Sequence, residues 1–164
     1  MTSDQADHGR NAALQLRSEY LLYLRDIVDC ITNAMTGLPA GPRRLFVAVE
    51  AFWEACYQRR ADRLRMLEAA EQTQTQAHLD ALSEIFTRML EVELRACGAL
   101  RPDELAGSLL SEVRDVARAE LFAGHRLPWE RRRLMGFMES RVGIGPVAGL
   151  PPVTSPVAAV SNLR

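Results

Sequence analysis

Hydrophobic residues recur every three or four positions along most of the chain, which is the spacing of one face of an α-helix. Alternation of apolar and polar residues, which is typical of strands, is almost absent. The pattern predicts an all-α fold, a single domain of five to seven helices. We expect helices at residues 11–35, 42–57, part of 58–75, 76–97, 101–122 and 128–141.

Prolines and glycines indicate where several of these helices begin and end. Pro42 suits the first position of a helix, because the N–H that proline lacks would have no partner there. Pro102 marks another start, and the carboxylates of Asp103 and Glu104 complement the positive end of the helix dipole. Gly98 is suited to end the helix before it.

The two ends of the chain differ in composition from its middle. Residues 1–10 contain no apolar run, and we expect them to form a flexible leader. Residues 143–164 are rich in proline and glycine, which predicts a disordered tail. Residues 11–142 are therefore expected to form one helical domain, which suits a chain of 164 residues.

The charge balance argues against a chain whose affinity comes from neutralising phosphates. The sequence has 20 basic and 21 acidic side chains, a formal net charge of −1, and 48% hydrophobic residues. Proteins that bind nucleic acid mainly through charge carry a basic excess. The three cysteines form no CxxC pair, and the sequence has neither a secretory signal nor an apolar run long enough to span a membrane. We therefore expect a cytoplasmic protein without membrane contact.

Motifs for catalysis or metal binding are not found in the sequence. It contains no GxSxG elbow, no glycine-rich phosphate loop and no dinucleotide fingerprint. His8, His78 and His125 are far apart and show no metal-ligand spacing. We expect no enzymatic activity, no metal and no cofactor. Cys56 and Cys97 lie beside apolar stripes, and we expect inert, buried thiols.

An aromatic cluster is the strongest candidate for a binding site. Ligand pockets are mainly apolar with a few polar groups. We predict that such a pocket is lined by Tyr20, Phe52, Trp53, Cys56, Tyr57, Met66, Phe86 and Met89. Polar groups that would orient a ligand there are Tyr20, Tyr23, Glu50, Glu54, Tyr57 and His78. The alternative is an ordinary core, since packing alone explains apolar residues at helical spacing.

Two arginine clusters are candidates for phosphate binding. They consist of Arg59, Arg60, Arg63 and Arg65, and of Arg126, Arg131, Arg132 and Arg133. Acidic neighbours weaken the field, and no aromatic residues interleave for base stacking. We expect solvated helix faces instead.

The order of these helices resembles the C-terminal, effector-binding half of TetR-family transcriptional regulators. The residues that carry the resemblance are GPRRLFVAVEAFWEACYQRRADRLRMLEA at 41–69, LSEIFTRMLEVELRACG at 82–98 and RPDELAGSLLSEVRDVARAELFAGHRLPWERRRLMGFM at 101–138. It implies an all-α domain that binds a small, mainly apolar effector. It also implies a dimer in which the last two helices of each chain form a four-helix bundle.

The resemblance assigns the dimer interface to apolar residues of the last two helices. We predict contacts by Leu109, Val113, Val116, Leu134, Phe137 and Met138. The alternative is that these residues are buried within one subunit.

Residues 1–20 are too few for the three-helix DNA reader of that family, so we expect no DNA binding by this chain alone. The expected partners are a second copy of the chain, or a full-length regulator with which it forms a heterodimer. The alternative function is a helical protein interaction module that binds no small molecule.

Overall fold

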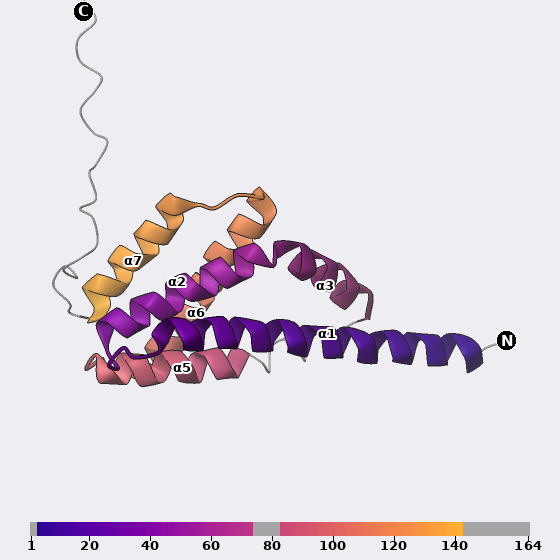
Figure 1. Cartoon of the computed structure of the whole chain (residues 1–164), viewed down its shortest axis with the longest axis horizontal. Helices are drawn as coiled ribbons and strands as arrows, with labels where there is room; N and C mark the ends of the chain where they lie inside the picture. The colour runs from indigo at the N-terminus through magenta and orange to yellow at the C-terminus, as the bar shows by residue number, and fades with distance from the viewer. Residues whose placement is uncertain (1–2, 74–82, 143–164) are drawn as a thin grey trace, which may run out of the picture.

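The computed structural model describes residues 3–73 and 83–142 (Figure 1). These residues form six helices and no strand, which confirms the predicted all-α fold. The helices are α1 Ser3–Met35, α2 Pro42–Gln58, α3 Arg60–Thr73, α5 Ser83–Ala96, α6 Pro102–Ala123 and α7 Pro128–Val142. The predicted tail at 143–164 and His78 lie outside the described residues.

Helix α1 begins at Ser3, not near residue 11 as the apolar pattern predicts. The described part of the predicted leader, residues 3–10, is thus helical. This segment has no apolar stripe, so the period of hydrophobic residues carries no signal there.

The apolar stripe expected on α1 is buried only along part of the helix. Tyr23, Ile27 and Ile31 are buried, whereas Leu14 and Leu21 are 57% and 45% exposed. In Figure 1 the N-terminal part of α1 extends beyond the other described helices. The apolar pattern predicts the helix, but it does not show how far the neighbouring helices extend along it.

Helix α2 lies at the centre of the molecule and contacts α1, α3, α5 and α6. Leu45 and Trp53, two turns apart on its inner face, are fully buried. The Trp53 indole Nε1 donates a hydrogen bond of 2.9 Å to the backbone oxygen of Val113 in α6. The aromatic stretch of the sequence therefore forms the core that joins the two halves of the chain.

Glycines follow the ends of two helices, and for Gly98 the sequence predicts this role. Gly98 follows α5 with φ of +79°, and Gly124 follows α6 with φ of +71°. Glycine adopts such left-handed conformations without steric cost. The Gly124 N–H donates a hydrogen bond of 3.0 Å to the backbone oxygen of Glu120. The chain then turns into α7, which lies on the outer side of α2 (Figure 1). No described helix is both long enough and apolar enough to cross a lipid bilayer.

Candidate functional site

The residues predicted to line an aromatic pocket are placed in and around the core. Phe52, Trp53, Cys56, Met66 and Phe86 are buried, and Tyr20, Tyr57 and Met89 are half-buried. The rings of Phe52 and Phe86 meet edge to face with centroids 5.5 Å apart. This geometry is a favourable aromatic packing contact between α2 and α5.

A small apolar cavity lies beside this aromatic contact. Its volume is about 30 Å³, and its lining comes from α1, α2, α5 and α6. Of the predicted pocket residues, Phe52, Phe86 and Met89 line it. Ligand pockets are about 300–1,000 Å³. The described residues therefore enclose a void far smaller than a ligand at this position.

An open groove of about 410 Å³ lies next to the cavity. It is bounded by the C-terminal end of α1, the residues that follow α1, the first turn of α2 and the middle of α5. Three residues, Met35, Met89 and Glu93, line both the groove and the cavity. Met89 is among the residues predicted from the sequence to line a pocket, whereas Met35 and Glu93 are not.

Glu93 is a buried carboxylate in the wall of the groove, with 2% of the residue exposed. Its Oε2 accepts a hydrogen bond of 3.2 Å from the Gly41 N–H. Its Oε1 lies 3.0 Å from Arg44 Nε, although that nitrogen makes no directed hydrogen bond among the described residues. Burial of one charge without the other would be costly, so the pair holds α5 against the start of α2. The signal in the sequence was the position of Glu93, seven residues after Phe86 and on the same helix face.

A second buried carboxylate, Glu120, fixes the turn between α6 and α7. It accepts two hydrogen bonds of 2.6 Å from Arg131 Nε and Nη2, and one of 2.9 Å from the Leu127 N–H. The Arg131 guanidinium also lies over the ring of Trp53, 5.5 Å from its centroid. These contacts attach α7 to α6 and to α2.

Glu54 belongs to the same network, since Arg131 Nη1 lies 3.9 Å from its Oε2. It accepts hydrogen bonds from Arg126 Nε at 3.1 Å and Nη2 at 2.5 Å. The bond from Arg126 lowers the pKa of the Glu54 carboxyl. Arg126 lies over the Tyr57 ring, 4.4 Å from its centroid. Glu50, another predicted polar group, is exposed on α2.

The arginine clusters are in large part paired with carboxylates. Arg126 and Arg131 are paired as described, Arg59 lies 2.5 Å from Asp26, and Arg133 lies 2.9 Å from Glu130. These pairs reduce the positive charge available to a phosphate.

Tyr23 and Cys56 face each other between α1 and α2. The Tyr23 hydroxyl donates to Cys56 Sγ at 3.9 Å, and burial raises the pKa of both groups. The Cys56 thiol is therefore protonated and unreactive at neutral pH. Cys97 is half-buried, and desolvation raises its pKa as well.

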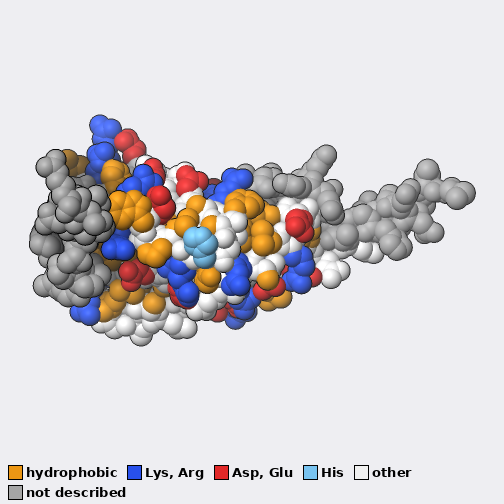
Figure 2. All heavy atoms as spheres, turned by 90° about the horizontal axis from the view of Figure 1, so that it is seen from above, with side chains coloured by type: hydrophobic (Ala, Val, Ile, Leu, Met, Phe, Trp, Pro, Cys, Tyr) orange, Lys and Arg blue, Asp and Glu red, His pale blue; other side chains and the backbone are white. Residues whose placement is uncertain are grey.

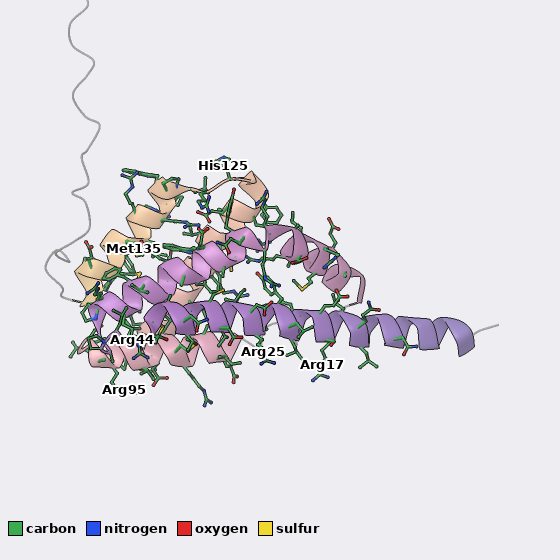
Figure 3. All side chains as sticks on the ribbon, in the orientation of Figure 1. Arg17, Arg25, Arg44, Arg95, His125 and Met135 are labelled. Carbon is green, nitrogen blue, oxygen red and sulfur yellow. The ribbon has the colours of Figure 1, made fainter. Side chains whose placement is uncertain are left out.

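No group of three or more metal-ligating side chains occurs among the residues that the structure describes. His125 is exposed in the turn between α6 and α7 (Figure 3).

The residues predicted for a dimer interface are mostly buried within the chain. Five of them are between 2% and 6% exposed, and Phe137 is 38% exposed. The five are Leu109, Val113, Val116, Leu134 and Met138. They pack inside the subunit, as the alternative interpretation holds, and any interface on these helices must use other side chains.

Large apolar residues that the sequence analysis did not assign to a surface are exposed on the same helices. Phe122, at the end of α6, is 66% exposed, and Trp129, at the start of α7, is 63% exposed.

Comparisons of this chain with models of protein families, with curated proteins and with solved structures find no match.

Proposed function

We propose that this chain is a helical dimerisation module that pairs through the outward faces of α6 and α7. The observation that carries the proposal is the exposure of Phe122 and Trp129, at 66% and 63%. Aromatic residues and arginines are the side chains that contribute most at protein interfaces. The Arg118 guanidinium lies over the Phe122 ring, and Arg141 lies over Phe137.

The outward face of α7 leaves open space around a glycine. Trp129, Arg133 and Gly136 are spaced by four and three residues, so they share one side of the helix. A Cβ added at Gly136 would meet no atom within 4 Å. Figure 2 shows the side of the molecule that carries α7, where hydrophobic side chains lie among charged ones.

The helix order supports a regulatory use of this pairing. The resemblance to the effector-binding half of TetR-type regulators favours a second copy, or a full-length regulator, as the partner.

Sedimentation equilibrium of the wild type and Trp129→Glu, across a wide range of protein concentration, tests the proposal. We expect a dimer for the wild type and a monomer for the variant, because the glutamate would lose its hydration in the interface. The matched control is Leu14→Glu, which places the same charge at a leucine of α1 that is 57% exposed. A monomeric wild type, or a dimer lost in Leu14→Glu and kept in Trp129→Glu, would contradict the proposal.

Sensing of a small apolar molecule is the second candidate function. The observation that favours it is the shared wall of the cavity and the groove, formed by Met35, Met89 and Glu93. This site is next to the predicted aromatic pocket and shares Met89 with it.

A further inference from the structure

Two methionines line both the apolar cavity and the open groove. Met35, at the end of α1, is 7% exposed, and Met89, in α5, is half-buried. Methionine is unbranched and flexible, so its side chain can change rotamer without movement of the backbone. A shift of these two side chains would join the cavity of about 30 Å³ to the groove of about 410 Å³. The joined space would reach the size of a ligand pocket.

The other side of the groove carries an arginine that is paired with Glu93. Arg44 lines the groove, and its side chain is 31% exposed (Figure 3). Its Nε lies 3.0 Å from Glu93 Oε1. Arg44 is in the first turn of α2, where the helix dipole favours an anion. Glu93 opposes an anion, but Arg44 and the Gly41 N–H compensate its charge.

We propose that the groove and cavity bind a medium-chain carboxylic acid. Its alkyl chain passes between Met35 and Met89 into the cavity, and its carboxylate accepts hydrogen bonds from Arg44 Nη atoms. A planar guanidinium matches a carboxylate in geometry as well as in charge. The inference rests on the second candidate function and adds the chemistry of the ligand.

The test is a titration of protein labelled with ¹³C in its methionine methyl groups, followed by NMR, with decanoate and with 1-decanol as probes. Signals are assigned with Met35→Leu and Met89→Leu. We expect saturable shifts of the Met35 and Met89 signals with decanoate. The signals of Met66 and Met138, which are 4% and 2% exposed elsewhere in the core, should not move.

Arg44→Gln separates recognition of the head group from burial of the chain. We expect it to weaken decanoate binding about tenfold, which is the loss of one hydrogen bond between charged groups. Binding of 1-decanol should stay within about twofold, because a hydroxyl gains little from the charge. The matched control is Arg43→Gln, which removes the same charge from an exposed side chain that does not line the groove.

Several outcomes would overturn the inference. They are the absence of saturable shifts, shifts of Met66 and Met138 equal to those of Met35 and Met89, and equal losses in Arg43→Gln and Arg44→Gln. If the protein binds 1-decanol but not decanoate, the inference is also overturned, while the proposed sensing of apolar molecules is not. If circular dichroism shows that Arg44→Gln does not fold, Arg44→Lys keeps the charge and removes the planar fork, and a weaker binding of decanoate is expected there too.

The titration is independent of the dimer. Repeated on Trp129→Glu, it should give the same shifts of Met35 and Met89, because Trp129 does not line the groove or the cavity.

Discussion

At the residue scale, this protein uses arginine for all its positive side-chain charges apart from histidine. The sequence contains no lysine, and its 20 basic residues are arginines. Arginine presents a planar fork that binds a carboxylate through two parallel hydrogen bonds. Arg126 with Glu54 and Arg131 with Glu120 both have this geometry. The two pairs join α2, α6 and α7 at one place.

Arg131→Lys should destabilise the protein, although it keeps the positive charge. An ammonium cannot make both hydrogen bonds to Glu120, which is 1% exposed and would be left partly unpaired. We expect a loss of about 1.5–3 kcal/mol in the free energy of unfolding, measured by urea denaturation. Arg132→Lys, an exposed position on the same helix, serves as the control and should change stability little. Equal effects of the two variants would show that the paired geometry is not important.

The stabilising effect of Glu54 should depend on pH. Its pKa is lowered from 4.5 in the folded protein, mainly by the hydrogen bond from Arg126. A lowered pKa stabilises the fold above the unfolded value, and this contribution is lost as the pH falls through the folded value. Glu54→Gln should therefore be less stable than the wild type at pH 7, and the difference should shrink below pH 4.5.

Urea denaturation across pH 3–7 measures this difference in stability. Glu50→Gln, which removes the carboxylate of an exposed glutamate on the same helix, is the control. A difference that stays constant down to pH 3 would argue against the Arg126 pair as its cause.

At the element scale, helix starts and ends follow from local chemistry that the sequence displays. Pro42 and Pro102 begin α2 and α6, and Gly98 and Gly124 follow α5 and α6. The start of α1 was predicted too late, because residues 3–10 carry no apolar stripe. The spacing of hydrophobic residues indicates a helix face that is buried. A helix end with no buried face has no such spacing in its sequence.

Glycine-to-alanine substitutions should have opposite effects on two elements. Gly136 lies inside α7 with open space around its Cβ position, whereas Gly124 has φ of +71°. Gly136→Ala should stabilise the monomer by about 0.5–1 kcal/mol. Gly124→Ala should destabilise it by about 1 kcal/mol, because alanine is strained in the left-handed region. Urea denaturation of both variants in the Trp129→Glu background, which separates folding from pairing, measures the two changes. The same sign for both would contradict this account.

At the scale of the whole molecule, the sequence predicts the core better than it predicts the candidate site. Trp53, Leu45 and Ile27 are buried as their helical spacing indicates. The same spacing does not distinguish a core from a pocket wall, and Phe52 with Phe86 forms a packed contact beside a small cavity. It also does not distinguish burial inside a subunit from burial between subunits. Val113 was placed at an interface because of the resemblance, and it is buried within the subunit.

The buried carboxylates were not predicted, although the position of Glu93 on an apolar helix face was a signal in the sequence. Glu93 and Glu120 lie on the inner faces of α5 and α6, where a carboxylate is unfavourable without a partner. Their partners, Arg44 and Arg131, come from other helices, and the sequence does not show which helices meet. The groove depends on the same missing information, because its walls come from α1, α2 and α5.

The two tryptophans lie in opposite environments, one fully buried and one 63% exposed. Because the sequence contains no other tryptophan, the intrinsic fluorescence has two sources that a soluble quencher such as iodide distinguishes. The quenchable signal belongs to Trp129 and reports on the surface of α7, whereas the protected signal belongs to Trp53 and reports on the interior. Folding and the proposed association of this protein are thus optically separable without any added label.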